Sequence, residues 1–199
     1  MTSWYNYFQS QCWYRNTYLV NNHYDVVEKN NIYNSGCHFT CLSMMLNVNA
    51  AVLSSELSKQ YYFEKGGSGF VWDNNKPNEE GISVCVPFLV TQNGIVENIK
   101  ITLVKKARNI RVTEAPKFIK EHHAQGQHLI CGNSEHSLLV AGEIDGNYFV
   151  WNPDTSGNSD EKVLINKNLS GEHTIDWLYS NYGVRNQIEF WVYQVENCT

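Results

Sequence analysis

Residues 34–46 read NSGCHFTCLSMML, and this segment predicts a helix that starts at a cysteine. We expect the helix to run from Cys37 to Asn47, with Ser35 as its N-cap and Gly36 and Cys37 in the first turn. This expectation rests on apolar residues that recur at helical spacing, namely Cys41, Leu42, Met45 and Leu46.

A thiol in the first turn of a helix meets unpaired backbone N–H groups and the positive end of the helix dipole. Both favour the thiolate, and cysteines in such settings titrate at roughly 3.5–7.5 instead of about 8.5. Cys37 is therefore a candidate nucleophile. The plain structural alternative is a small, buried residue at the start of a helix.

The sequence predicts helices mainly in the first half of the chain and strands in the second. The expected helices are Cys37–Asn47, Ala51–Gln60, one capped by Thr113 and closed near Gly126, and Thr174–Asn181. The expected strands are Ile99–Val104, Gln127–Gly132, Ser137–Ala141, Asn147–Trp151 and Gln187–Val195. This distribution favours an α+β fold over alternating α/β units. With no repeat and no linker, we expect one domain over residues 1–199.

Two segments before the sheet lack a clear pattern. Residues 65–81 are expected to form a loop, because glycines crowd its start. Gly81–Asn93 is ambiguous, because Pro87 interrupts an otherwise plausible helix.

A histidine opens one predicted strand, in His136-Ser-Leu-Leu-Val-Ala-Gly142, and the next strand ends in Asn152-Pro-Asp154. A two-residue turn at Asp145-Gly146 would set His136 opposite residue 155. A five-residue loop over 142–146 would set it opposite Asn152, and the two glycines bounding that loop favour this register. Asn152 could then hold the imidazole in one tautomer, whereas the plain alternative is an ordinary histidine at a sheet edge.

Composition and charge exclude several classes of protein. The 199 residues include 42% hydrophobic side chains, so the chain is not wholly disordered. The net charge of −5 does not suit nucleic-acid phosphates, and no apolar run is long enough to cross a membrane. The first residues do not form a secretory signal, so we expect a cytoplasmic protein.

The six cysteines are expected to be reduced thiols, because the chain is long enough to fold without disulfides. Cys85 and Cys131 lie in apolar runs, so we expect them in the core. Cys37 and Cys41, together with His38 or His136, form only a weak zinc pattern, because a second Cys/His pair is missing. We expect no metal and no organic cofactor.

The helix that starts at Gly36-Cys37 and the pair His136–Gly142 and Tyr148–Pro153 together resemble the papain-like cysteine peptidases. The resemblance is closest to the branch that processes bacteriocin leaders. It covers Ser35–Asn49 and Gln127–Asp154 well and the helix after Thr113 loosely. It implies a helical N-terminal part, with the nucleophile at a helix N-terminus, packed on a C-terminal antiparallel sheet.

The resemblance also implies roles for individual residues. Cys37 would be the nucleophile, His136 the general base and then acid, and Asn152 the residue that orients the imidazole. Asp154 is the alternative orienting residue. The family places a glutamine before the nucleophile to stabilise the oxyanion. Here we favour Gln11 for that role over the candidates Asn31 and Gln9.

The implied activity is cleavage of a peptide or protein amide through a thioester acyl-enzyme. Deamidation and acyl transfer use the same triad and stay open as related reactions. From another class, a catalytically degenerate module that binds a peptide or protein partner would fit the missing glutamine at the family's usual position.

Overall fold

The computed structural model describes residues 2–14, 32–59, 71–73, 76–77, 80–81, 83–133, 136–154, 162–164 and 187–198. The helical segments are η1 (Gln11–Trp13), α1 (Ile32–Ser35), α2 (Cys37–Met45), α3 (Ala50–Lys59) and α4 (Ala115–His123). The strands are β1 (Thr2–Ser3), β2 (Val71–Asp73), β3 (Lys76–Pro77), β4 (Ser83–Val90), β5 (Val96–Arg111), β6 (His128–Gly132), β7 (Ser137–Ile144), β8 (Asn147–Trp151), β9 (Lys162–Leu164) and β10 (Gln187–Asn197).

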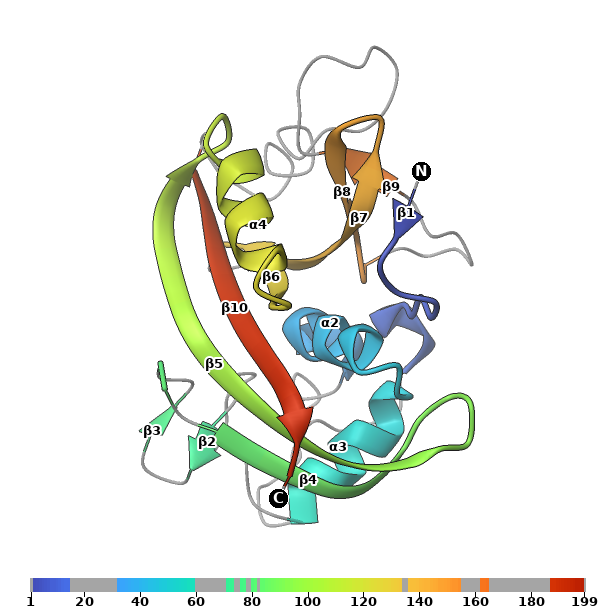
Figure 1. The fold of residues 1–199 in the computed structure, drawn as a ribbon. Helices are drawn as coiled ribbons and strands as arrows, with labels where there is room; N and C mark the ends of the chain where they lie inside the picture. Colours follow the sequence, from blue (N-terminus) through green and yellow to red (C-terminus); the bar gives the residue numbers. More distant parts are fainter. Residues whose placement is uncertain are drawn as a thin grey trace.

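One sheet organises the fold. Its strands run in the order β4-β5-β10-β6-β7-β8-β9, with β1 added on β7, and each described pairing is antiparallel. The sheet curves around α2 and α3 (Figure 1). Helix α4 packs against side chains of the opposite face, in a separate core cluster. Helices and an antiparallel sheet therefore form an α+β fold, as the sequence predicts.

Strand alternation decides which side chains reach each helix layer. In β10, Phe190 and Val192 join the core under α4, whereas Trp191 and Tyr193 join the core around α2. Successive side chains on a strand point to opposite faces, so this division follows from the period of two. The ring of Tyr193 therefore faces the helix that carries Cys37.

The central helix, α2, is surrounded by the core. Its residues from Phe39 to Met45 are all buried. A helix that is apolar on every side belongs inside the molecule. It ends at Met45, two residues before the predicted end, and Asn47 follows with a left-handed φ of 54°.

The predicted N-cap of this helix is wrong. Gly36, not Ser35, occupies the cap position, and none of the described side chains caps the helix. Ser35 instead ends α1, so the chain passes from one helix to the next through Gly36. A Cβ atom at Gly36 would lie 2.4 Å from the carbonyl oxygen of Ile32, so only glycine fits this junction.

Most other predicted elements are present with shifted ends. Strands β6 and β8 match their predictions within one residue, whereas β5 and β10 extend beyond theirs. Helix α3 is displaced by one residue from its predicted position, and Glu114, not Thr113, caps α4. The predicted helix Thr174–Asn181 and the loop residues 65–70 lie outside the described residues, and β2 and β3 occupy part of the remainder of that loop.

The ambiguous segment Gly81–Asn93 contains strand β4. Pro87 is tolerated because β4 is the last strand at one edge of the described sheet, where one row of its backbone groups has no partner strand among the described residues. The pairing with β5 is irregular between Val86 and Leu89, and Phe88 has a φ of 57°. The N–H of Phe88 donates to the side chain of Asn98 instead of continuing the ladder.

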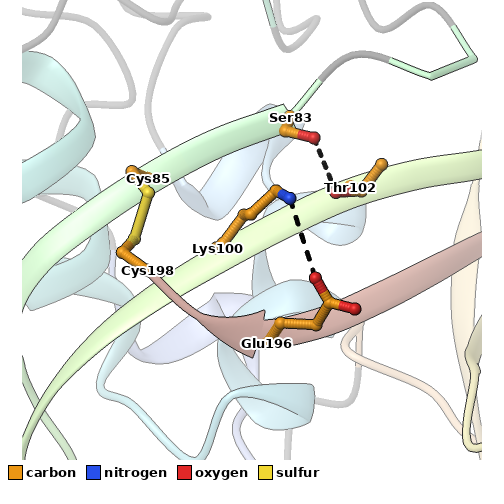
Figure 2. Close-up of polar contacts among 6 residues, drawn as sticks. All are labelled: Ser83, Cys85, Lys100, Thr102, Glu196 and Cys198. Atoms are coloured by element: carbon orange, nitrogen blue, oxygen red, sulfur yellow. Dashed lines mark hydrogen bonds and ion pairs between the residues drawn. A yellow bond between two sulfur atoms is a disulfide. The ribbon is translucent and has the colours of Figure 1, made fainter.

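The expectation that Cys85 is a reduced core residue is wrong. Cys85 is exposed and forms a disulfide with Cys198, which follows β10 (Figure 2). The apolar run around Cys85 alternates, so Val84 and Val86 point into the core and Cys85 points out. Cys131 is buried as predicted, and within the described ranges no single helix is long and apolar enough to cross a membrane.

Polar side chains surround the disulfide on the same outer face. Lys100 of β5 lies 3.7 Å from the carboxylate of Glu196 on β10, and Ser83 and Thr102 share a hydrogen bond of 2.7 Å (Figure 2). Both charged side chains are well exposed, so the ion pair adds little stability. The disulfide, in contrast, joins the edge strand β4 covalently to the C-terminal end of the chain beyond β10.

Candidate active site

His136 and Asn152 meet at one end of the β7–β8 hairpin. His136 directly precedes β7 and Asn152 directly follows β8. The His136 Nε2 atom lies 2.8 Å from the Asn152 Oδ1 atom, and each residue is only 4% exposed. Two residues sixteen positions apart thus form a buried hydrogen bond, as the sequence predicts.

The register that produces this contact differs from the predicted one. The hairpin has the tight turn at Asp145-Gly146, with Ile144 opposite Asn147. An irregularity between Val140 and Gly142 then shifts the pairing by one residue, so that Leu139 lies opposite Trp151. The five-residue loop is therefore wrong, and His136 reaches Asn152 because both residues lie beyond the paired part of the hairpin.

The orientation of Asn152 is set by a second hydrogen bond. Its Oδ1 atom also accepts the backbone N–H of Asp154, at 2.9 Å. The same oxygen therefore faces the His136 ring, and the ring nitrogen that meets it must be the protonated one. In the neutral imidazole, Nδ1 is then the nitrogen with the lone pair, which is the form a general base needs.

A short turn holds the backbone of His136. Its N–H donates to the Oδ1 atom of Asn133 at 2.7 Å, and its carbonyl accepts the N–H of Asn133 at 2.9 Å. A Cβ atom at Gly132 would lie 2.2 Å from the His136 carbonyl oxygen. Glycine at 132 is thus what allows the chain to turn tightly in front of the histidine.

Cys37 is half-buried at the start of α2, which packs on β7. Its sulfur accepts hydrogen bonds from the backbone N–H and the hydroxyl of Ser137, and from the backbone N–H of His38. Ser137 is the residue after His136. The structure therefore brings the thiol next to the strand end that carries the imidazole.

The pKa of the Cys37 thiol differs from the expectation of a lowered value. Burial raises the pKa, because a thiolate loses hydration there, and the negative charge of Asp154 adds to this effect. The hydrogen bonds from Ser137 and His38 act in the opposite direction, because they stabilise the thiolate. With neutral histidines around it, the resting Cys37 is a thiol.

Burial also lowers the pKa of His136, since a charged imidazolium is poorly solvated there. The hydrogen bond to Asn152 and the charge of Asp154 both raise it. Asp154 thus acts on the ring through its charge, while its carboxylate accepts the Cys12 thiol at 3.7 Å. Of the two candidates for the orienting role, Asn152 is the one whose side chain hydrogen-bonds to the imidazole.

Gln11 lies between the two halves of the candidate site. Its Nε2 atom donates to the carbonyl of Tyr33 in α1, at 2.9 Å, and its backbone N–H donates to the carbonyl of Pro153, at 2.8 Å. Its Oε1 atom is buried and has no hydrogen-bond partner among the described residues. A glutamine far upstream in the sequence is therefore placed between the helix before Cys37 and the loop after Asn152.

The other two candidates for the oxyanion role are Gln9 and Asn31. The Gln9 side chain is fully buried, donates to the carbonyl of Val48 at 2.6 Å, and accepts from the hydroxyl of Tyr14 and the N–H of Ala50. These bonds give Gln9 a structural role. Asn31 lies outside the described residues.

Sequence reasoning did not identify Ser137 as part of the site, and it considered His38 only as a zinc ligand. Both hydrogen-bond to Cys37, and their side chains also contact each other. Their positions next to His136 and Cys37 were the only available signal. Within the part of the chain that the structure describes, no three His, Cys, Asp or Glu side chains form a group that could hold a metal ion.

Comparisons with known proteins add no relative. No family model, no curated protein and no solved structure matches this chain. The papain-like resemblance therefore depends on the residues and their geometry alone, and it stays a prediction.

Proposed function

We propose that this chain is a papain-like thiol hydrolase that cleaves a peptide or protein amide. Cys37 is the nucleophile, His136 the general base and acid, and Asn152 the orienting residue. The observation that carries the proposal is the buried His136–Asn152 hydrogen bond of 2.8 Å beside Ser137, whose N–H and hydroxyl bond to the Cys37 sulfur. A nucleophile, a base and an orienting group in this relation are the minimum for covalent catalysis.

In the first half of the reaction, the Cys37 proton moves to Nδ1 of His136 and the sulfur attacks the carbonyl carbon. The imidazolium then protonates the leaving amine, and a thioester remains on Cys37. In the second half, His136 removes a proton from water, which attacks the thioester and releases the acid and the thiol. Asn152 accepts the Nε2 hydrogen throughout, which keeps the ring in one orientation.

The oxyanion of each tetrahedral intermediate needs a hydrogen-bond donor. The amide of Gln11 uses one N–H on the Tyr33 carbonyl and has a second N–H to offer. A donor of this kind contributes roughly a hundred- to a thousandfold to turnover. Gln11 is therefore the residue we assign to this role.

The thioester can also pass its acyl group to another acceptor, so deamidation and acyl transfer are related outcomes of the same chemistry. None of these steps requires an organic cofactor. The predicted cytoplasmic location stays a prediction, and the Cys85–Cys198 disulfide weighs against it, because disulfides persist mainly in oxidising compartments.

Alkylation of Cys37 tests the proposal directly. The full-length protein is treated with iodoacetamide at about pH 6, where a free cysteine is almost entirely thiol. Mass spectrometry of peptides separates Cys37 from Cys12, which is also half-buried and serves as the internal reference. His136 takes the Cys37 proton as the sulfur attacks, so the reaction does not need a resting thiolate. We therefore expect Cys37 to react faster than free cysteine and the His136→Ala variant to lose this advantage. Equal rates in both proteins would contradict the proposal.

A second candidate function is a catalytically inactive module that binds a peptide. Two observations favour it: burial raises the pKa of Cys37, and the Gln11 amide already donates to a backbone carbonyl. An inactive module gains nothing from an activated thiol. Slow alkylation of Cys37 that is insensitive to His136 would support this function over hydrolysis.

A further inference from the structure

A line of polar side chains connects strand β10 to the candidate nucleophile. The Tyr193 hydroxyl lies 2.7 Å from the Nε2 atom of His38, and the Nδ1 atom of His38 lies 3.1 Å from the Ser137 hydroxyl. That hydroxyl bonds to the Cys37 sulfur. The residues come from β10, α2 and β7, so only the tertiary fold assembles this line.

His38 stays neutral in this position. Desolvation and, to a smaller extent, the positive charge of Lys106 together lower its pKa to about 3. The Trp191 ring packs edge-on against the imidazole, with centroids 5.0 Å apart, and the Lys106 ammonium lies over the same Trp191 ring. A neutral imidazole has one N–H donor and one acceptor nitrogen. It can therefore accept a hydrogen bond from one neighbour and donate one to the other.

We propose that Tyr193, His38 and Ser137 form a directed hydrogen-bond chain that donates to the Cys37 sulfur, which makes them positioning residues for the nucleophile. In this direction the Tyr193 hydroxyl donates to Nε2 of His38, the Nδ1–H of His38 donates to Ser137, and the Ser137 hydroxyl donates to the sulfur. The inference rests on the proposed function, because it concerns how the same thiol becomes a thiolate.

The direction of these hydrogen bonds decides whether the Ser137 hydroxyl can donate to the Cys37 sulfur. If His38 carried its hydrogen on Nε2, its Nδ1 atom would be an acceptor and would compete with Cys37 for the Ser137 hydroxyl. Donation from Tyr193 to Nε2 favours the other tautomer. The two backbone N–H bonds to the sulfur do not depend on this choice. Of the three donors to the sulfur, the Ser137 hydroxyl is thus the one that depends on the tautomer of His38.

Other charged or titratable groups around the thiol do not replace this donor. Asp154, after β8, and the neighbouring thiol of Cys41 in α2 interact unfavourably with a thiolate on Cys37. His136, before β7, is the base that receives the proton. Lys106 on β5 acts on His38. A charged form of Cys37 therefore depends on hydrogen bonds as well as on the imidazolium.

The test is the pH profile of Cys37 alkylation by iodoacetamide in the full chain. A hydrogen bond to a charged group corresponds to about one pKa unit. We expect Ser137→Ala to shift the midpoint upward by about one unit and to slow alkylation about tenfold below it. Tyr193→Phe removes only a hydroxyl and is expected to shift the profile in the same direction by a smaller amount.

Ser137→Thr keeps a hydroxyl and is expected to restore the wild-type profile. Ser43→Ala is the matched control, because the Ser43 hydroxyl bonds to the Phe39 carbonyl within α2 and lies outside the chain. It should leave the midpoint unchanged. If Ser137→Ala does not fold, Tyr193→Phe and Ser137→Thr decide the outcome.

The two proposals fail in different ways. In one case, alkylation of the wild type is fast and depends on His136, but its pH profile is the same in Ser137→Ala and Tyr193→Phe. This result would overturn the hydrogen-bond chain and leave the hydrolase proposal intact. A slow wild-type reaction that does not depend on His136 would overturn the hydrolase proposal, and the chain with it.

Discussion

Replacing Asn152 with alanine removes an oxygen that accepts two hydrogen bonds. The donors are the Nε2–H of His136, at 2.8 Å, and the backbone N–H of Asp154, at 2.9 Å. His136 is 4% exposed, so solvent reaches the abandoned ring nitrogen poorly. The substitution therefore affects both the stability of the fold and the state of the base.

The cost in stability follows from the two unsatisfied donors. Each buried donor left without a partner costs about 1–3 kcal/mol, and the Asp154 N–H is the less buried of the two, so we expect a loss of about 2–4 kcal/mol. For a chain of this size the melting temperature should fall by roughly 5–15 °C. Denaturant unfolding of wild type and variant measures the loss.

The effect on chemistry follows from the pKa of His136. Desolvation lowers this pKa and the Asn152 bond raises it, so the variant ring is a weaker base and is also free to change tautomer. We expect alkylation of Cys37 near neutral pH to fall about ten- to a hundredfold, within the range that a positioned base contributes. Iodoacetamide kinetics over a pH series measures this.

Asp154→Asn is the matched control. It removes the charge that raises the pKa of His136 and keeps the backbone N–H that holds Asn152. We expect its stability to change by less than about 1 kcal/mol. An Asn152→Ala protein with wild-type stability and an unchanged alkylation profile would refute the reasoning.

Three further outcomes are expected. Gln11→Ala should slow acylation by p-nitrophenyl acetate roughly a hundred- to a thousandfold, whereas alkylation, which forms no oxyanion, stays within about twofold; equal losses in both assays would remove the oxyanion role. Cys198→Ser, like reduction of the wild type, should lower the free energy of unfolding by about 4–5 kcal/mol, because the bond to Cys85 spans 113 residues; no change on reduction would show that the bond is not formed. The folded pKa of His38, about 3, lies below its ordinary value of 6.5, so its contribution to stability is present above 6.5 and is lost as the pH falls toward 3. His38→Gln should flatten this part of the stability curve, and an acid limb identical to wild type would contradict the assignment.

The candidate site was largely predictable from the sequence, but one argument for it was wrong. The predicted register of the hairpin sets His136 opposite Asn152, and the two side chains do meet, at 2.8 Å. The five-residue loop that predicts this register is absent. The hairpin has a tight turn at Asp145-Gly146 instead, and an irregularity near Gly142 shifts the register by one residue. Strand alternation does not reveal such an irregularity, since it depends on how the sheet bends.

Errors in the fold came from patterns with two interpretations. The run Val84-Cys-Val86 was interpreted as a continuous core segment, although the same letters fit an alternating edge strand. Alternation places Cys85 outside, where it reaches Cys198. Ser35 is a good N-cap by chemistry, but the preceding residues already form α1, and the cap position falls on Gly36.

The sequence by itself determined the α+β class, the helix that begins at Cys37, and the strand ends that carry His136 and Asn152, because these depend on local periodicity and on residue type. Only the tertiary structure decided that Gln11 lies against Tyr33 and Pro153, and that Tyr193 and His38 lead to Ser137. These partners are far apart along the chain. They meet because the curved sheet brings β10, β7 and the N-terminal segment around one buried helix, and no local pattern encodes that meeting.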